Sequence, residues 1–448
     1  MDNVVDLTNG SIPKKLANLA LPLMGTSFLN MAYSLTDLYW VGTVGTKAVA
    51  AVGTCGLFWW LAQSITLICQ IGLAVSVSQN FGKRDFEAVD SYINTGVKLN
   101  MIIALLFSST VFLFHRQVLS FFNIIDPETL RDAEIYLQTV SPGYFFLFMN
   151  PILSVILNST GNSRATFKIN GMGVIMNMIL DPLFIVSLNM KVFGAALATA
   201  LSQLFVFIVY IYSGRKHKFL YTEVDYKKNW DTRKAREILD LGIPPALQSA
   251  IHCFISMYIN KMVNSFGSAP VAAQSIGSQI ESISWMTSEG FSTATATFVG
   301  QNYGAGKHKR ADKAYFTSIK IMTAVGIFAT LLLYFGRYPI ISLFLHEKEA
   351  IEYGALYLMA LSFSQLFMCI EIVDSGAFSG ISMTKPPSII GITGNLLRIP
   401  LSYALIPKFG IVAIWIAISF SSVLKGIVSF VWFNILKHRR LDLKKNAN

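Results

Sequence analysis

Charged residues are scarce in this 448-residue chain: Asp, Glu, Lys and Arg make up 14% of it, against 53% hydrophobic residues. A soluble globule of this length needs more polar surface than that to cover its core, so the composition excludes one. The mean hydropathy of +0.52 instead indicates an integral membrane protein.

Cysteine is also rare. The four cysteines (Cys55, Cys69, Cys253 and Cys369) lie in apolar runs without a close pair, which argues against a disulfide framework or a zinc site. The formal charge of +11 could point to nucleic acid, but the basic residues are spread over loops rather than gathered on one face. We therefore expect no nucleic-acid partner.

Catalytic motifs are missing. The chain has no phosphate-binding Gly-x-x-x-x-Gly-Lys-Ser/Thr loop, no His-Glu-x-x-His and no Gly-x-Ser-x-Gly. Its longest segment outside the apolar runs is about 22 residues, too short to bury a nucleotide-binding core. An intramembrane enzyme would need a dense His/Asp/Glu cluster, and His252 stands without one. We expect no enzyme and no cofactor, so an ion gradient or the substrate's own gradient must supply the energy.

A repeat is the most informative feature present. Ser78-Gln79-Asn80-Phe81-Gly82 and Gly300-Gln301-Asn302-Tyr303-Gly304 lie 222 residues apart, each after a long apolar run, and at the same spacing Pro22 meets Pro244. Internal duplication in a hydrophobic chain is common in secondary transporters.

Apolar segments long enough to cross a bilayer occur twelve times, as two sets of six. They lie near 15–42, 47–80, 87–113, 130–157, 164–188, 193–213, 237–264, 270–301, 309–335, 350–380, 387–407 and 411–436. The predicted fold class is an all-α membrane protein with two six-helix bundles. The predicted domains are an N-lobe (1–214), a basic cytoplasmic linker (215–236), a C-lobe (237–436) and a basic cytoplasmic tail (437–448).

The basic residues also predict the orientation. Of the 36 Lys and Arg residues, 24 fall on the side of the termini and seven on the opposite side. The positive-inside rule then places both termini in the cytoplasm. We expect a multi-pass protein of the cell membrane, with the lipid bilayer as its surroundings and a monomer as its working form.

Ionisable side chains inside spans are costly, and Asp37 and Asp181 are the two in the first lobe's outer half. Asn30, Tyr33 and Asp37 share one helix face, and so do Asn170, Asn177 and Asp181. Thr199 reaches a similar depth, and Pro182 frees a carbonyl one turn before it. Two facing polar stripes around one cavity are predicted. The alternative is that both acids lie near the interface and reach outer water.

The second lobe lacks counterparts of these acids, since the repeat aligns Ile259 with Asp37 and Ile399 with Asp181. It has a polar set of its own: Gln248, His252, Glu281, Glu371 and Asp374. Its carboxylates could bind a cation, or could form ion pairs with Lys261, Lys320, Arg398 or Lys425 that fix helix packing. For Glu281 and Glu371 both interpretations stay open, whereas His252 alone is more typical of packing.

The duplicated spans, the Gln-Asn-Tyr-Gly-Ala-Gly-Lys run at 301–307 and the first-lobe acids resemble the multidrug and toxic compound extrusion (MATE) transporters. The resemblance, closest to DinF-like members, implies a V-shaped pair of bundles and export of cationic amphiphiles driven by protons or sodium. It implies a coupling site of Tyr33, Asp37, Asn177, Asp181 and Thr199, with Asn30 where a Gln is familiar and Pro22 as a hinge. The second-lobe site of NorM-like members is in doubt, because His252 replaces its Glu and Asp374 is displaced by about two turns.

The function predicted is a secondary antiporter that exports cationic or amphiphilic small molecules through the Asp37/Asp181 site. Protons are favoured as the coupling ion. Sodium is the alternative, bound by Asp37, Asn177, Asp181 and Thr199. The runner-up function is a lipid-linked oligosaccharide flippase, which would favour a strongly cationic cavity that the sparse in-span cations do not provide.

Overall fold

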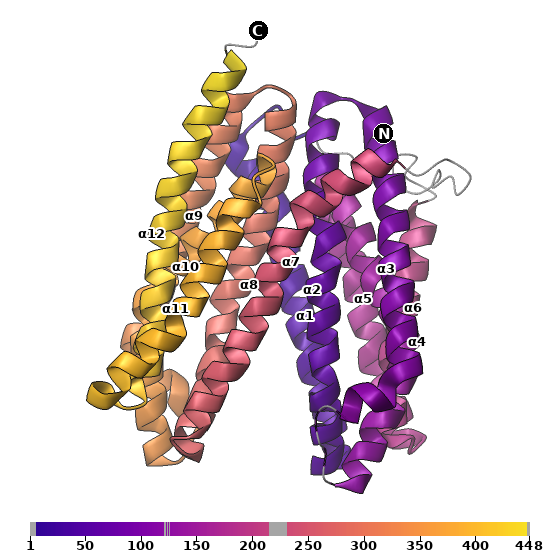
Figure 1. The fold of residues 1–448 in the computed structure, drawn as a ribbon, viewed down its shortest axis with the longest axis vertical. Coiled ribbons are helices and arrows are strands. Elements are labelled where there is room, and N and C mark those ends of the chain that lie inside the picture. Colours follow the sequence, from indigo (N-terminus) through magenta and orange to yellow (C-terminus); the bar gives the residue numbers. More distant parts are fainter. Residues whose placement is uncertain (1–5, 121, 123, 125, 215–230, 446–448) are drawn as a thin grey trace. The chain divides into compact units, whose positions relative to one another are not determined.

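The computed structural model describes residues 6–120, 122, 124, 126–214 and 231–445, and these form twelve α-helices and one short π-helix (Figure 1). The α-helices are α1 (Ile12–Val44), α2 (Thr46–Lys83), α3 (Phe86–Ser120), α4 (Pro127–Ser159), α5 (Ser163–Asp181), α6 (Lys191–Gly214), α7 (Thr232–Asn264), α8 (Ser268–Gly304), α9 (His308–Ser342), α10 (Lys348–Gly380), α11 (Lys385–Phe409) and α12 (Val412–Lys445). The π-helix η1 (Pro182–Ser187) follows α5 directly. The predicted all-α fold with twelve long helices is confirmed.

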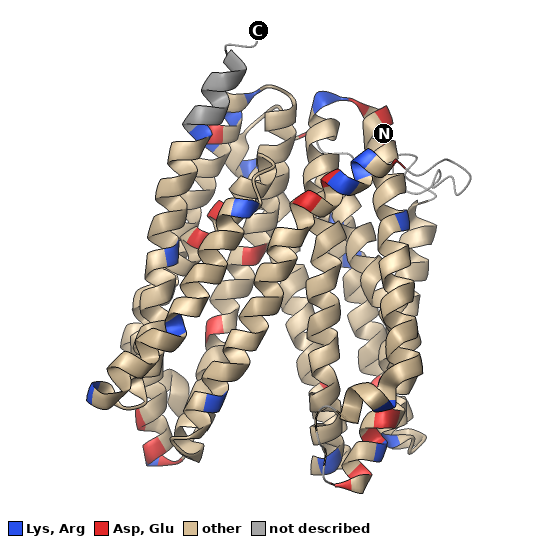
Figure 2. Cartoon of the chain, in the orientation of Figure 1, with Lys and Arg blue, Asp and Glu red and all other residues tan. Residues whose placement is uncertain are grey.

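Among the described residues, ten helices are long and apolar enough to cross a membrane. The two long helices that fall short on composition are α1 and α8, which carry Asp37 and Glu281. Charged side chains gather at the helix ends and are sparse along the middle of the helices (Figure 2). This distribution matches a chain whose helices lie in hydrocarbon, where an unpaired charge is costly.

The chain divides into two compact units, and the division cuts two helices. Gly25–Ala246 belong to the first unit, whereas Leu7–Met24 and Leu247–Asn448 belong to the second. The first part of α1 therefore packs with α8, α9 and α10 of the second unit, where Leu16, Leu19 and Leu23 are buried. The first part of α7 packs within the first unit, where Ile238 is buried.

Glycines allow these helix parts to pack closely. A Cβ on Gly242 of α7 would lie 1.7 Å from the Ile68 carbonyl oxygen of α2, and one on Gly72 of α2 would lie 2.5 Å from the Ile238 carbonyl oxygen. In the second unit, a Cβ on Gly290 of α8 would lie 2.6 Å from the Met24 amide nitrogen of α1. Only glycine permits such close approach of two backbones.

These crossings are related by the sequence repeat, because Ile68 and Gly290 are separated by 222 residues. Each unit thus accepts the first part of a helix that continues in the other unit, with Pro22 and Pro244 close to the points of division. The lobe limits predicted at 214 and 237 fall instead at the end of α6 and within the first two turns of α7. Of the predicted linker, residues 215–230 lie outside the described residues, and of the predicted tail, residues up to 445 continue α12.

The second copy of the repeated motif holds a strap made of Leu7, Thr8, Asn9 and Gly10. The Leu7 amide donates to the Gln301 side-chain oxygen at 3.2 Å, and the Asn302 side chain donates to the Leu7 carbonyl at 3.2 Å. Arg310 adds bonds to the carbonyls of Asn9 and Gly10, each at 2.7 Å. The motif therefore has a structural role in pairing the backbone amide and carbonyl of the buried Leu7.

We expect Arg310→Ala to loosen this strap, because charge-assisted bonds to several carbonyls are lost together. Amide hydrogen exchange over residues 7–10 should accelerate by about tenfold or more. The neighbouring Lys309 is exposed, so Lys309→Ala removes the same charge as a control and should leave exchange unchanged. Equal exchange in both variants would contradict the role given to Arg310.

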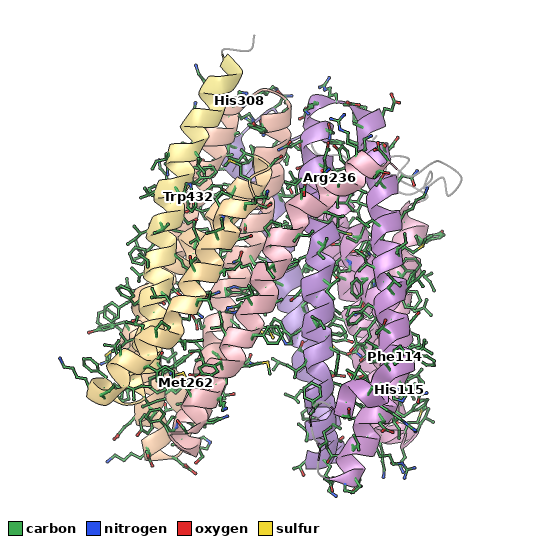
Figure 3. All side chains as sticks on the ribbon, viewed as in Figure 1. Phe114, His115, Arg236, Met262, His308 and Trp432 are labelled. Carbon is green, nitrogen blue, oxygen red and sulfur yellow. The ribbon has the colours of Figure 1, made fainter. Side chains whose placement is uncertain are left out.

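Two local features interrupt or begin helices in the first unit. The backbone of α3 leaves the helical region at Phe114 (φ −112°, ψ 19°), and the adjacent His115 ring nitrogen lies 2.8 Å from the Phe112 carbonyl oxygen (Figure 3). Asp126 caps α4 by accepting from the amide and hydroxyl of Thr129. Hydrogen bonds from the Thr129 hydroxyl and amide hold the pKa of Asp126 below its usual range.

Candidate functional site

The candidate site lies where α1, α5 and α6 of the first unit approach one another. Close contacts fix the register of α1 against α5. A Cβ on Gly25 would lie 2.6 Å from the Phe167 ring, and one on Gly171 would lie 3.4 Å from the Leu29 side chain. Both contacts pair residues 142 positions apart, so the helices run parallel, and Asp37 falls level with the last turn of α5.

Contacts between α5 and α6 fix an antiparallel register. A Cβ on Gly173 would lie 2.2 Å from Val206, and the Tyr210 hydroxyl donates to the Asn170 side-chain oxygen at 3.0 Å. Because the two helices are antiparallel, each residue further along α5 lies level with a residue one position earlier in α6. Thr199 therefore falls level with Asp181, as the geometry of two adjacent helices requires.

Five of the predicted residues meet in this region. The Asn177 side-chain amide donates to one Asp181 oxygen at 3.1 Å, and both residues are fully buried. The carboxylates of Asp37 and Asp181 interact electrostatically. The Tyr33 hydroxyl lies near enough to both carboxylates to interact with them electrostatically, and it lies beside the Thr199 side chain. The facing polar stripes predicted from the sequence thus come together at Tyr33, Asp37, Asn177, Asp181 and Thr199.

Several buried oxygens at this site have no hydrogen bond of normal geometry within the part of the chain that the structure describes. They are Tyr33 Oη, Asp37 Oδ1, Asn177 Oδ1, Asp181 Oδ2, Thr199 Oγ1 and Ser202 Oγ. Buried polar atoms are almost always satisfied, so a concentration of exceptions needs an explanation. The hydroxyls among them can donate or accept, whereas the amide and carboxylate oxygens can only accept, and these oxygens lack a donor or a cation in this geometry.

Gln203 and Ser202 are neighbours of the site that the sequence reasoning missed. Asn150 of α4 donates to the Gln203 side-chain oxygen at 2.9 Å, and Gln203 lies within range of the Tyr33 hydroxyl. The signal was present in the sequence, since Gln203 follows Thr199 by one helical turn and shares its face.

The backbone at Asp181 changes as the proline predicts. Helix α5 ends at Asp181, and Pro182 begins the π-helix η1, in which the Leu188 amide bonds to the Leu183 carbonyl at 2.9 Å. Proline lacks an amide hydrogen, so the regular α-helical ladder cannot continue through it. The second carboxylate therefore lies at the junction of the α-helix and the π-helix.

Asn30 and Pro22 are placed differently from the other candidates. The Asn30 side chain is exposed, and the Asn30 backbone carbonyl accepts a hydrogen bond from the Ser34 hydroxyl at 3.2 Å. Asn30 therefore does not join the buried cluster. Pro22 lies inside a continuous α1, so its role as a hinge stays a prediction.

In the second unit, all three predicted acids already have partners. Glu371 is 3.0 Å from the Lys425 ammonium, as the packing interpretation expects, and Asp374 accepts from the Tyr315 hydroxyl at 2.8 Å. Glu281 accepts from the Gln365 amide at 3.3 Å.

The remaining second-unit candidates lie between α7 and α11. One His252 ring nitrogen lies 3.1 Å from the Asn395 side-chain nitrogen. The Gln248 side chain lies across Gly391, where a Cβ would come within 2.2 Å of it. Among the described residues no group of three or more His, Cys, Asp or Glu side chains could hold a metal ion.

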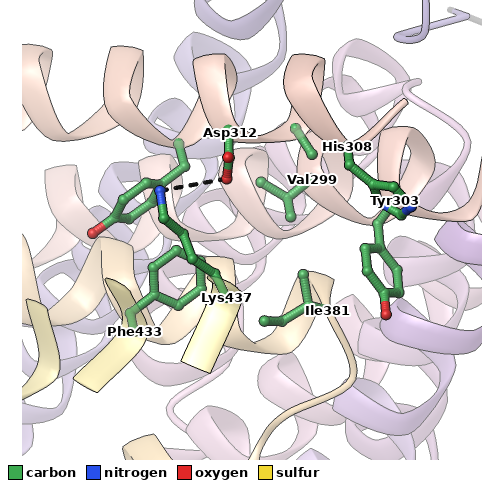
Figure 4. Close-up of a pocket in the computed structure, with 9 residues that line it drawn as sticks. Val299, Tyr303, His308, Asp312, Ile381, Phe433 and Lys437 are labelled. Atoms are coloured by element: carbon green, nitrogen blue, oxygen red, sulfur yellow. Dashed lines mark ion pairs between the residues drawn. The ribbon is translucent and has the colours of Figure 1, made fainter. Parts of the chain in front are cut away.

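A small pocket near the ends of α8, α9 and α12 offers no alternative site. It is lined by nine residues, among them Tyr303, His308 and Phe433, and the Asp312–Lys437 ion pair of 3.5 Å borders it (Figure 4). Its volume of about 20 Å³ has room for roughly one water molecule. A drug-sized molecule does not fit there.

The repeat, the helical units and the first-unit cluster can be compared with known proteins. The family model described as MatE matches residues 22–183 and 244–404, one match in each half of the chain. The chain belongs to the MATE family. Members of this family are transporters and not enzymes, and the protein is accordingly a multi-pass membrane protein.

Individual relatives of this MATE protein match over nearly its whole length. The "Probable multidrug resistance protein YpnP" of Bacillus subtilis is 27% identical over 98% of both chains. The "FAD transporter" of Shewanella oneidensis is 24% identical over 95% of both chains. The crystal structure described as "MATE in complex with MaD3S" has a TM-score of 0.92, 21% identity and 99% coverage of both chains. At that identity the structural likeness shows the shared fold.

Proposed function

We propose that the chain is a secondary antiporter that exports cationic or amphiphilic small molecules in exchange for protons through the Asp37/Asp181 site. The observation that carries the proposal is the concentration of unpartnered buried oxygens around two interacting carboxylates. Relatives described as multidrug resistance proteins support the substrate class. The relative described as an FAD transporter extends that class beyond simple cations.

A proton would supply what the cluster lacks. Protonation of either carboxyl turns one of its oxygens into a hydrogen-bond donor. The second carboxylate or the Asn177 oxygen can then accept that hydrogen bond. Two ionised carboxylates that interact in a buried setting repel each other, so the pair favours holding one proton. The Asn177 amide and the Tyr33 hydroxyl would orient the two acids.

Exchange would follow from competition for negative charge. When a cationic substrate enters, its positive charge stabilises the fully ionised pair and the proton leaves. When the substrate has gone, the proton returns. A ligand shifts such an equilibrium only by its difference in affinity for the two states, and here the difference comes from charge.

Sodium would use the same oxygens in another way. Asp37 Oδ1, Asn177 Oδ1, Asp181 Oδ2 and Thr199 Oγ1 are chemically suited to a hard cation. A sodium ion needs several of them arranged around it at once, whereas a proton needs one. This difference favours protons.

Inverted membrane vesicles with separately imposed gradients decide between the two ions. We expect a pH gradient at equal sodium to drive uptake of a fluorescent cation at several times the background rate. A sodium gradient at equal pH should have little effect. Uptake that follows sodium and ignores pH would replace the proton by sodium at this site and leave the family unchanged.

The orientation proposed from the basic residues places both termini in the cytoplasm and the chain in the cell membrane as a monomer. The asymmetry of Lys and Arg between the two ends of the spans supports it. In that orientation Asp37 and Asp181 lie toward the outer half of the membrane.

A further inference from the structure

A column of polar side chains continues from the Asp37/Asp181 site toward the end of the first unit that carries the turn between α4 and α5. Three helices contribute to it: Asn150, Ser154 and Asn158 come from α4, Thr166 and Asn170 from α5, and Gln203 and Tyr210 from α6. We call it the first-unit polar column. All of its residues belong to the same compact unit. In the orientation proposed above, the column leads from the acids to the cytoplasm.

The first part of the column begins at the site itself. Gln203 lies beside the Tyr33 hydroxyl. The Asn150 side-chain amide donates to the Gln203 side-chain oxygen at 2.9 Å and to its backbone carbonyl at 3.0 Å. The side-chain oxygen of Asn150 has no partner among the described residues, although Asn150 is only 6% exposed. The site is therefore joined to α4 through Gln203, and Asn150 keeps an unpartnered acceptor.

The second part of the column is centred on the Tyr210 hydroxyl. This hydroxyl donates to the Asn170 side-chain oxygen at 3.0 Å and lies beside the Ser154 and Thr166 side chains. The Asn158 amide nitrogen lies 3.5 Å from the Ser154 hydroxyl. The Asn158 oxygen and the Thr166 hydroxyl have no partner in the described part of the chain, and these residues are 6% and 0% exposed. A network that only held helices together would be expected to satisfy these atoms.

An apolar contact separates the two parts between α5 and α6. Val206 lies between Gln203 and Tyr210 along α6, and its side chain faces Gly173 of α5, where a Cβ would approach it to 2.2 Å. A contact this close leaves no room for a water molecule between the two helices. Between α5 and α6 the column is therefore interrupted.

Asn150 bridges this interruption from α4. Helices α4 and α6 run side by side in the same direction, since a Cβ on Gly143 would lie 3.0 Å from Ala200 and Ser154 lies beside the Tyr210 hydroxyl. These pairs are 57 and 56 residues apart in the sequence. The same offset puts Asn150 level with the apolar contact, so its unpartnered oxygen lies between the two parts of the column.

The corresponding place on α10 of the second unit is apolar. The run Leu147-Phe148-Met149 before Asn150 recurs as Leu366-Phe367-Met368, and the residues that take the places of Asn150, Ser154 and Asn158 are then Cys369, Val373 and Ala377. All three are fully buried. The repeat thus shows that this scaffold packs without polar side chains here. The column accompanies the two acids, whose counterparts the second unit also lacks.

We propose that the first-unit polar column is the route by which protons pass between the Asp37/Asp181 site and the cytoplasmic end of the first unit, with Asn150 as its bridge and Val206 as its seal. This inference rests on the proposed function as a proton-coupled exporter. It adds that the proton has a route of its own inside one unit.

Side-chain amides do not pass protons on themselves, so the column acts by holding water molecules in line. Buried waters bridge polar atoms of the kind left unpartnered on Asn150 and Asn158. Each water takes a proton from one neighbour and releases one of its own to the next. Every oxygen then regains its starting protons while one proton leaves at the far end. The distance from Asp181 to Thr166 along α5 is about 22 Å.

The apolar contact at Val206 serves coupling. A route open at all times would dissipate the gradient whenever the acids were also accessible from the other side of the membrane. Val206 against Gly173 closes the space between α5 and α6 to water and to charge. Passage then depends on the bridge from α4, so a single amide controls it.

The rate of proton release tests the route. Tetramethylrhodamine methyl ester, a permanent cation, is mixed rapidly with the purified full chain in nanodiscs in weakly buffered solution, and a pH indicator records the amount and the rate of release. We expect Asn150→Leu to release as much as the wild type about tenfold more slowly, because the acids are intact and one polar partner on the route is lost. Asn150→Ser restores a hydroxyl and should return the rate to within about twofold of the wild type.

The amount and the rate separate this inference from the function on which it rests. Absence of any release from the wild type removes the proposed function. Release in equal amount and at equal rate from the wild type and from Asn150→Leu removes the route alone.

Asn100→Leu on α3 is the matched control. Asn100 is a fully buried amide of the same unit that donates to the Phe148 carbonyl of α4 at 3.0 Å, and its oxygen is also unpartnered within the described residues. It is not part of the column, so its loss should leave the rate of release unchanged. Slowing equal to that of Asn150→Leu would indicate a general loosening of α4 and contradict the role given to Asn150.

Tyr210→Phe keeps the test available if Asn150→Leu is not monodisperse. It keeps the ring and removes only the hydroxyl that bonds to Asn170, and it should slow release several-fold. Tyr212→Phe, at an exposed tyrosine of the same helix, should leave the rate unchanged. Equal rates in these two variants would contradict the route.

Val206→Ala tests the seal. It removes the methyl groups that meet Gly173, so water can enter between α5 and α6. Proteoliposomes without substrate, loaded with a pH indicator, should then leak protons several-fold faster than those with the wild type. A leak equal to that of the wild type would contradict the role given to Val206.

Discussion

Replacing Asp181 by Asn is expected to reduce gradient-driven accumulation of cationic substrates to background while leaving the protein folded. The new side chain has the same size, and its amide oxygen can still accept the 3.1 Å hydrogen bond from Asn177. It cannot bind and release a proton, nor supply the negative charge that a cation competes for. The same outcome is expected for Asp37→Asn, whose carboxylate interacts with that of Asp181.

Accumulation in inverted vesicles is the measurement, normalised to the amount of monodisperse protein. Asp240→Asn is a matched control, since Asp240 is an exposed acid of the first unit. Its efflux should equal that of the wild type. Normal accumulation by Asp181→Asn would remove this carboxylate from the coupling mechanism.

Gly242→Ala is expected to have the largest effect on stability. The added Cβ would lie 1.7 Å from the Ile68 carbonyl oxygen and 2.5 Å from its carbonyl carbon. Backbone atoms of a second helix cannot rotate away as a side chain can, so α7 and α2 must separate along the crossing. Overpacking typically costs 1–3 kcal/mol, and we expect a loss of about 3 kcal/mol or more here.

Thermal unfolding followed by size-exclusion chromatography measures this loss. Gly56→Ala on the same α2 is the control, because a Cβ at Gly56 meets nothing within 4 Å. That substitution should be neutral or slightly stabilising, since alanine favours helix. Similar melting of both variants would show that the crossing tolerates separation.

The first-unit site could be predicted from the sequence because its signal is periodic. Tyr33 and Asp37 are one turn apart, and so are Asn177 and Asp181, so each pair must share a helix face. Membrane helices rarely carry such acids without a reason. Asn30 follows the same helical spacing as Tyr33 and Asp37 but is exposed. The buried face of α1 is therefore narrower than the polar stripe predicted from the sequence.

The division of α1 and α7 between units could not be predicted in the same way. The repeat that aligns Pro22 with Pro244 indicates two equal copies, but it does not say which copy each helix part packs against. That is decided by close backbone crossings at Gly242 and Gly290. A glycine in an apolar run has many uses, and its partner is visible only in three dimensions.

The pairing of the charged side chains in the second unit could not be predicted from the sequence either. Arg398 was grouped there with the cations that could pair with an acid. The structure gives the ion pair to Lys425 and leaves Arg398 to two serine hydroxyls. Which of two cations pairs with Glu371 depends on side-chain reach across helices, and spacing along the chain does not contain that information.

Proton release on substrate binding tests the central claim most directly. The purified protein is placed in weakly buffered solution with a pH indicator, and tetramethylrhodamine methyl ester, a permanent cation, is added. The account predicts acidification that grows with the amount of bound ligand and is absent in Asp37→Asn and Asp181→Asn. Binding without acidification in the wild type, or equal acidification in these variants, would contradict it.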